Sequence, residues 1–75
     1  MQGDSALGRA VALVRDLRAR CPWDAAQTPQ TLRPYLVEET LELDQAIRHD
    51  DLEAVREELG DLLLNFAFQI VIPRL

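Results

Sequence analysis

Apolar residues recur every three to four positions along most of this chain, which is the spacing of one face of an α-helix. The spacing predicts a first helix over residues 5–20. Pro22 disfavours helical geometry at Cys21, so this helix is expected to end there. Residues 21–33 are predicted to form a loop with a short turn at Thr28, where a threonine N-cap precedes Pro29. The apolar stripe of the first helix consists of Leu7, Ala10, Val11, Val14 and Leu17.

Two longer helices are predicted after the loop, over residues 34–48 and 51–72. Pro34 either breaks the turn before it or opens the first of these helices. The connector of residues 49–51 is short, so the two helices are expected to be antiparallel neighbours. Asp50 is predicted to cap the second helix, with Glu53 as its capping-box partner. The predicted core faces are Leu36, Thr40, Leu43 and Ile47 on the first helix, and Leu52, Val55, Leu59, Leu62, Leu63, Phe66 and Ile70 on the second.

The composition supports a small all-α domain. Apolar residues make up 48% of the 75 residues, too many for a disordered chain, and three glycines with four prolines leave few turns for a β-sheet. A chain this short hides only about 60% of its unfolded surface and is marginal alone. We therefore predict one domain over residues 1–75, a helical bundle whose antiparallel helix hairpin is completed by oligomerisation.

Charge and cysteine content exclude several classes of protein. The net charge is −5, all eight basic residues are arginine, and no basic stripe exists for a nucleic-acid backbone. The single cysteine, Cys21, cannot form an internal disulfide, which fits a reducing, cytoplasmic setting. The first residues lack the apolar run of a signal peptide, and no stretch reaches the ~18 apolar residues of a membrane span. We expect no nucleic-acid polymer and no membrane among the partners.

The acidic residues are concentrated in one part of the chain. Ten of the 13 carboxylates lie within residues 38–61, where they form either a solvated helix face or a cation site. Glu39 and Glu42 are one helical turn apart, and Glu58 and Asp61 repeat that spacing on the next helix. Because the two helices are predicted to be antiparallel neighbours and both pairs flank apolar stripes, the pairs are expected to converge across the groove.

Converging carboxylates repel one another unless positive charge lies among them. Arg48 and Arg56 lie near the connector rather than along the acidic stripe, which favours a divalent cation over arginine partners. Carboxylate oxygens suit Mg²⁺ or Mn²⁺, and no cysteine or histidine cluster suggests zinc. The spacing of the acids therefore predicts a metal site on the hairpin.

Longer motifs surround these acids. In chain order they are RCPWD at residues 20–24, QT at 27–28, LRPYLVEE at 32–39 and EELGDLL at 57–63. In order and spacing, this combination resembles the MazG family over residues 7–70, and it is far more specific than the helical pattern. The resemblance implies an all-α nucleoside triphosphate pyrophosphohydrolase, which converts a nucleoside triphosphate and water to a nucleoside monophosphate and pyrophosphate.

The resemblance also implies roles for the acids. Family metal ligands correspond to Glu39, Glu42, Glu58 and Asp61, with Mg²⁺ or Mn²⁺ as the cofactor. Glu38 is close enough to bind metal or to position water. The catalytic base is Glu38 or Glu39, and the sequence does not choose between them. Family members are at least dimeric, so a homodimer or a higher homo-oligomer is expected.

Three further residues are candidates for substrate binding, each with a structural alternative. Trp23 stacks on a base, or plugs the core as a lone tryptophan after a helix-ending proline more often does. Arg33 meets a phosphate or a metal-bound pyrophosphate, or is a surface arginine. Asn65, one turn after Asp61, reads a sugar or base, or is a satisfied amide. Gly60, in the middle of a predicted helix, is expected to mark a close contact between helices.

The end of the chain raises an alternative function. Family domains continue into at least one more helix, which carries basic residues toward the phosphates, whereas this chain stops at Leu75. We therefore expect either a C-terminally truncated domain or a missing wall supplied by another subunit. The alternative to an active pyrophosphohydrolase is a catalytically weak helical oligomerisation or regulatory module that keeps the family sequence.

Overall fold

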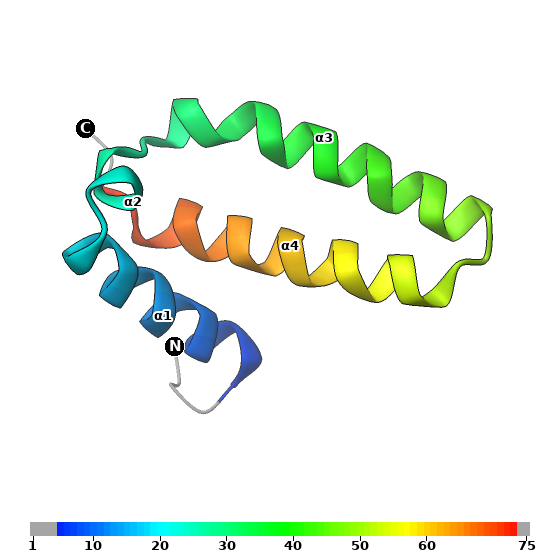
Figure 1. Cartoon of the computed structure of the whole chain (residues 1–75), viewed down its shortest axis with the longest axis horizontal. Helices are drawn as coiled ribbons and strands as arrows, with labels where there is room; N and C mark the ends of the chain where they lie inside the picture. The colour runs from blue at the N-terminus through cyan, green and yellow to red at the C-terminus, as the bar shows by residue number, and fades with distance from the viewer. Residues whose placement is uncertain (1–4, 74–75) are drawn as a thin grey trace.

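The computed structural model describes residues 5–73, and these form four α-helices with no strand among them (Figure 1). The helices are α1 (Ala6–Arg20), α2 (Pro22–Ala26), α3 (Pro29–Arg48) and α4 (Leu52–Val71). α3 and α4 lie side by side as a long antiparallel hairpin, and α1 packs against α4 near one end of it. The predicted all-α class and the antiparallel hairpin are confirmed. No helix in the described part of the chain has the length and apolarity needed to cross a membrane.

The first helix follows its predicted pattern closely. Ser5 is the N-cap, and its hydroxyl oxygen accepts a hydrogen bond of 2.9 Å from the backbone N–H of Gly8. Val11 and Val14 are buried, because the apolar stripe of α1 faces α4. The helix ends at Cys21, which adopts an extended conformation before Pro22. The predicted bounds of this helix are therefore correct to within one residue.

The prediction of a loop over residues 21–33 was wrong, but the N-cap predicted at Thr28, with Pro29 after it, is confirmed. Pro22 opens the short helix α2, and α3 begins at Pro29 and continues through Pro34. The start of α3 is well capped, because Thr28 and Thr31 exchange side chain–backbone hydrogen bonds of 2.9 and 3.1 Å. Pro34 costs the helix one backbone hydrogen bond. Leu32 lies two residues before Pro34 and is buried. It anchors this first part of α3 in the core.

The cap of α4 lies one residue later than predicted. Asp51, not Asp50, accepts the capping hydrogen bond, 3.2 Å from the backbone N–H of Ala54. Asp50 instead has a φ of 52°, a left-handed conformation that aspartate tolerates better than most residues. Asp50 therefore forms part of the turn between α3 and α4, and Asp51 is the N-cap of α4.

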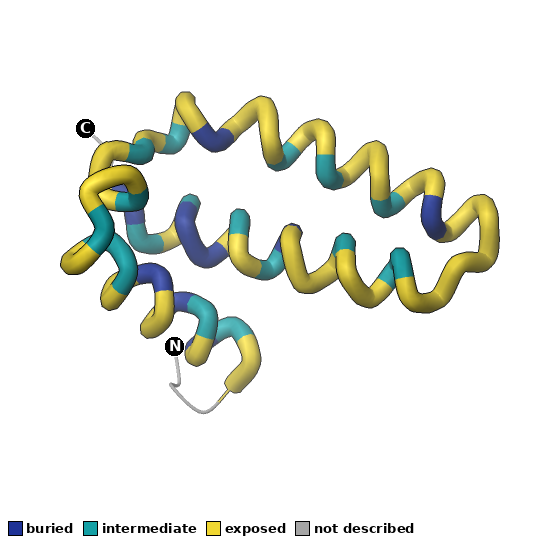
Figure 2. The backbone as a smooth tube through the Cα atoms, viewed as in Figure 1, coloured by how far each residue is buried: buried dark blue, intermediate teal, exposed yellow. Residues whose placement is uncertain are grey.

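The core lies at one end of the hairpin, where α1 meets the start of α3 and the end of α4 (Figure 2). It contains no polar or charged side chain among the described residues. Toward the other end, only Leu62 and Ala46 are buried, and most of α3 and α4 is exposed. The buried members of the core cluster are Val11, Val14, Leu32, Ala67, Phe68 and Ile72.

Both predicted core faces of the hairpin were partly wrong. On α3, Thr40 is exposed and Ile47 is 56% exposed, whereas Glu39 and Ala46 turn inward. α4 is apolar around most of its circumference, and only two of its sides are covered, one by α3 and one by α1. The remaining stripe stays open, and its exposed members are Leu52, Leu59, Phe66 and Ile70.

Gly60 does not mark a close contact between helices within this chain. It is exposed, and a Cβ added there would meet no atom within 4 Å. The predicted packing reason for this glycine is therefore absent from the described part of the chain.

Candidate metal centre

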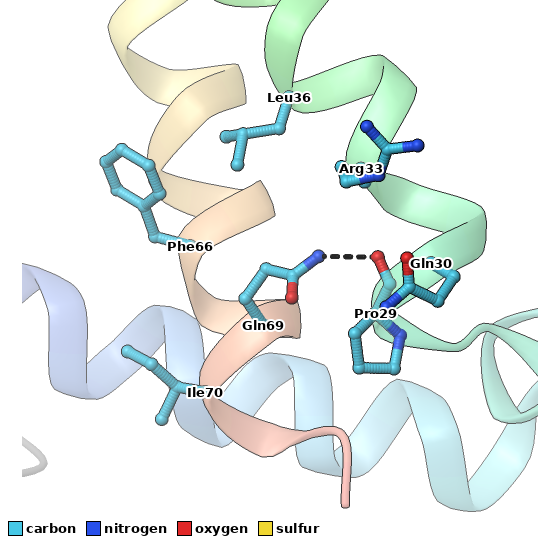
Figure 3. Close-up of a pocket in the computed structure, with 7 residues that line it drawn as sticks. All are labelled: Pro29, Gln30, Arg33, Leu36, Phe66, Gln69 and Ile70. Atoms are coloured by element: carbon cyan, nitrogen blue, oxygen red, sulfur yellow. Dashed lines mark hydrogen bonds between the residues drawn. The ribbon is translucent and has the colours of Figure 1, made fainter. Parts of the chain in front are cut away.

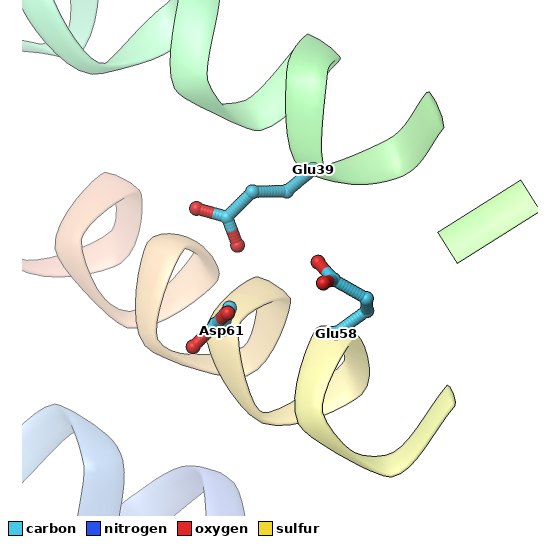
Figure 4. Close-up of side chains that lie close together, drawn as sticks. All are labelled: Glu39, Glu58 and Asp61. Atoms are coloured by element: carbon cyan, nitrogen blue, oxygen red, sulfur yellow. The ribbon is translucent and has the colours of Figure 1, made fainter. Parts of the chain in front are cut away.

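Three carboxylates meet between α3 and α4. Glu39 comes from α3, while Glu58 and Asp61 lie one turn apart on α4, and Figure 4 shows the three side chains close together. Each offers an oxygen, and these three oxygens lie within 4.8 Å of one another. The antiparallel arrangement of the hairpin produces this meeting, because residues far from the connector on one helix face residues equally far from it on the other.

The fourth predicted ligand, Glu42, borders this group through Glu58. Glu42 is exposed and is not among the three residues whose oxygens lie within 4.8 Å of one another. Burial raises the pKa of Glu58 above its usual value, and the contact with Glu42 raises it further. The negative charges of Glu42, Asp61 and Glu39 act in the same direction. The structure thus brings three of the four predicted ligands together, and Glu42 acts on them through the pKa of Glu58.

Glu39 has a second partner that distinguishes it from the other acids. Burial raises the pKa of Glu39, and the charge of Asp61 adds to this effect. A hydrogen bond from Asn65 lowers the pKa, because it favours the ionised carboxylate. Glu38 is exposed, and its charge reaches the group only by raising the pKa of Glu39.

Two oxygens of the group are buried without a hydrogen-bond partner among the described residues. They are Oε2 of Glu39 and Oε2 of Glu58. A buried anionic oxygen without a partner costs free energy, and a cation between such oxygens would remove that cost. No arginine among residues 5–73 bonds to these two oxygens, and Arg48 pairs instead with Asp44 at 3.0 Å, both at exposed positions. These orphaned oxygens fit a hard divalent cation such as Mg²⁺ or Mn²⁺.

A largely apolar pocket of about 340 Å³ adjoins the carboxylates. Glu39 and Asn65 line it, so the pocket and the acidic group share a wall. Trp23 and Tyr35 supply aromatic surface to its lining. Trp23 is 60% exposed, so the expectation that it plugs the core was wrong, and its ring is available to a ligand.

Arg33 is not brought to the carboxylates. It lines a different pocket of about 410 Å³, together with Leu36 of α3 and with Phe66 and Ile70 from the open apolar stripe of α4 (Figure 3). In this pocket the side-chain amide of Gln69 donates a hydrogen bond of 3.1 Å to the backbone oxygen of Pro29. None of the grouped carboxylates lines it.

Comparison with known proteins decides the family. Residues 27–74 match the family described as MazG nucleotide pyrophosphohydrolase domain. The chain belongs to the MazG family. The matched segment contains Arg33, Asn65 and the four carboxylates predicted as metal ligands, and it begins after Trp23. No solved structure matches the chain.

Curated relatives of this MazG chain carry names that state an activity. Proteins named nucleoside triphosphate pyrophosphohydrolase are 51% identical in Mycobacterium tuberculosis, over 79% of this chain, and 47% identical in Escherichia coli K12, over 73%. A Thermotoga maritima protein named nucleoside triphosphate pyrophosphohydrolase/pyrophosphatase MazG is 42% identical over 85% of the chain. The matches span only 18%, 21% and 26% of these relatives.

Two residues of the MazG site escaped sequence reasoning. Tyr35 lies one helical turn before Glu39, a spacing that could have placed it on the same side of α3. Arg18 lies outside the apolar stripe of the first helix, and its guanidinium donates to the backbone oxygens of Asp24 and Gln27, at 3.2 and 3.1 Å. These bonds tie α2, and with it the tryptophan wall of the pocket, to α1. No sequence signal identifies backbone oxygens as partners.

Proposed function

We propose that this MazG domain is a Mg²⁺-dependent nucleoside triphosphate pyrophosphohydrolase, with Mn²⁺ as a substitute. The reaction converts a nucleoside triphosphate and water to a nucleoside monophosphate and pyrophosphate. The observation that carries the proposal is the pair of buried, unpartnered oxygens of Glu39 and Glu58, which lie beside Asp61 inside the matched segment. Family membership and the names of the curated relatives support it.

In this proposal the carboxylates of Glu39, Glu42, Glu58 and Asp61 hold the metal. When bound, Mg²⁺ supplies charge neutralisation for the triphosphate and lowers the pKa of a coordinated water. Glu38 or Glu39 accepts the proton of the attacking water. The bridging oxygen between the α- and β-phosphates leaves with its bonding electrons, so one molecule of water is consumed for each pyrophosphate released.

The pocket beside the carboxylates accommodates the nucleoside. Trp23 and Tyr35 offer flat apolar surface on which a base stacks, while Glu39 lies in the same pocket wall. A base stacked in this pocket therefore leaves its phosphates next to the carboxylates that hold the metal. Asn65 borders both regions and contacts the sugar or base only through its carbonyl oxygen, because its N–H groups point to Glu39 and to the backbone of Asp61.

A second copy of the chain completes the domain. The open stripe of α4 exposes Leu52, Leu59, Phe66 and Ile70, and Leu36 of α3 borders it. A soluble monomer rarely leaves such a row of large apolar side chains uncovered. In the proposed homo-oligomer a second copy covers this stripe. Arg33 lies at the edge of the stripe, so it would contact the phosphates bound at the carboxylates of the other copy and not those of its own. The proposed setting is the cytoplasm.

The test is pyrophosphate release from common and non-standard nucleoside triphosphates, with Mg²⁺, with Mn²⁺ and with a chelator. We expect release that depends on metal and yields the monophosphate, with at least one triphosphate clearly preferred. Release of inorganic phosphate and a diphosphate instead would contradict the proposed bond cleavage.

The alternative function is a catalytically weak oligomerisation or regulatory module, and the open apolar stripe is the observation that favours it. The same assay separates the two functions. A folded, metal-binding oligomer that releases no pyrophosphate from any triphosphate supports the module and contradicts the enzyme.

A further inference from the structure

Asn65 makes a contact that its chemistry allows in only one orientation. Its side-chain nitrogen lies 2.8 Å from Oε1 of Glu39 on the opposite helix and 3.3 Å from the backbone oxygen of Asp61. An ionised carboxylate only accepts hydrogen bonds, so the amide nitrogen and not the amide oxygen must face Glu39. Both N–H groups of Asn65 are then directed at protein atoms of the metal group.

This contact leaves the two oxygens of Glu39 in different environments. Oε1 accepts from Asn65, whereas Oε2 is buried without a partner. One oxygen of Glu39 turns toward Glu58 and Asp61, and the other turns away from them (Figure 4). A glutamate side chain has three rotatable bonds, and a hydrogen bond at one oxygen restricts the position of the other.

We propose that Asn65 is a positioning residue, which holds the Glu39 carboxylate by Oε1 so that Oε2 is presented to the divalent cation. The proposal rests on the proposed function, because it assumes that the cation binds among Glu39, Glu58 and Asp61. Partners of this kind fix a ligand before the metal arrives and thereby raise metal affinity. Asn65 also spans the two helices that carry the ligands, so it sets their register at the site.

The experiment compares Asn65→Leu with Gln69→Leu in the full chain. Each substitution replaces a side-chain amide on α4 that donates a hydrogen bond to α3, but Gln69 bonds to Pro29, away from the carboxylates. Leucine is a good helix former, so both variants should keep their helices. Mn²⁺ affinity is measured by titration calorimetry without nucleotide, and the melting temperature is measured in chelator. Asn65→Gln is the conservative variant, since it retains the amide donor on a longer side chain.

We expect Asn65→Leu to weaken Mn²⁺ binding by roughly 10–100-fold, the usual loss when the partner of a metal ligand is removed. Gln69→Leu should bind Mn²⁺ as the parent does, and Asn65→Gln should recover part of the loss. Parent-like Mn²⁺ affinity in Asn65→Leu overturns the positioning role while leaving the proposed function intact. Equal weakening in both leucine variants also overturns it, because the effect then comes from packing of the hairpin. A parent that binds no Mn²⁺ overturns the metal site, and the positioning role with it.

Discussion

The two halves of the α3–α4 hairpin are built from the same pair of helices but differ in what lies between them. Near the start of α3, Leu32 meets Phe68 and Ile72 in a core that contains no polar side chain among the described residues. Further along, Glu39 faces Glu58 and Asp61, with two buried oxygens left without partners. The apolar half stabilises the hairpin, whereas repulsion between ionised carboxylates in the acidic half destabilises it.

The difference between the two halves explains how a small domain can hold mutually repelling carboxylates close together. Carboxylates that converge between two free helices would push them apart. Here the helices are fixed at one end by the core with α1 and at the other by a short, capped connector. The acids therefore sit in the span between two anchored ends, and their repulsion cannot open the hairpin without breaking one of these anchors.

The largest effect is expected from the apolar half. Ile72→Ala removes a buried side chain, only 4% exposed, that takes no part in the metal group. Its loss should lower the free energy of unfolding by about 2–5 kcal/mol, the usual range for isoleucine to alanine in a core. Denaturant unfolding monitored by circular dichroism measures the change. A decrease below about 1 kcal/mol would mean that the anchor at this end is weaker than its burial indicates.

The next effect concerns the acidic half and compares Asp61 with Asp44. Asp61→Asn removes a proposed ligand with little change in volume, and it should cut turnover by orders of magnitude. Asp44→Asn makes the same chemical change at an exposed position that pairs with Arg48, and it should leave turnover within a few-fold. The assay is pyrophosphate release at saturating Mg²⁺, with folding matched by circular dichroism. Equal effects of the two substitutions would contradict the assignment of Asp61.

A smaller effect follows from the raised pKa values of Glu39 and Glu58. Above pH 4.5, the usual carboxyl pKa, the folded metal-free chain binds more protons than the unfolded chain. The free energy of unfolding should therefore fall as the pH rises from 4.5 through the raised pKa values of the folded state. Glu58→Gln should raise the melting temperature in chelator near neutral pH, because it removes one of the repelling charges.

Millimolar Mg²⁺ should reverse this trend, since the cation binds the ionised carboxylates of the folded chain only. The measurement is the melting temperature of the parent and of Glu58→Gln from about pH 5 to about pH 8, with and without Mg²⁺. The difference between the two proteins isolates this site from other titrating groups. A difference that does not change with pH or with Mg²⁺ would remove Glu58 from the metal group.

The smallest effect is expected at Gly60, which lies on α4 between the two acids of that helix. A Cβ there meets nothing within the chain, so Gly60→Ala should stabilise the monomeric fold by about 0.5–1 kcal/mol through helix propensity. Sedimentation and denaturant unfolding together measure the outcome. A loss of stability that accompanies a loss of oligomer would instead place this glycine against a partner subunit.

Sequence alone predicted the elements better than their faces. The periodicity in α1 predicted the correct helix and the correct buried stripe, because most apolar residues of α1 lie on one side and arginines occupy much of the rest. α4 is apolar on more than two sides, and its pattern cannot say which sides α1 and α3 will cover. Leu59 and Phe66 therefore passed for core residues, although both are exposed.

The candidate site was predictable as far as it depends on helical spacing, but not where it depends on which side of a helix faces its neighbour. The spacing of Glu39, Glu58 and Asp61 follows from helical geometry, so their convergence required only a short connector between antiparallel helices. The bond from Asn65 to Glu39 depends on the rotation of α3 about its own axis, which the sequence leaves open. The continuation of α3 through Pro34 was missed because the rule for proline is local, whereas Leu32 is buried by residues far along the chain.

The shortness of the connector has a consequence for the order of folding. Glu39 and Asp61 belong to two helices joined by only a few residues, so closing the loop between them costs little chain entropy. α1 packs against α4, and the two are separated in sequence by α2 and α3. Contacts of such high sequence separation form more slowly. We expect hydrogen exchange during refolding to protect α3 and α4 before α1. The cation site would then assemble with the hairpin itself, ahead of the core that later fixes its position.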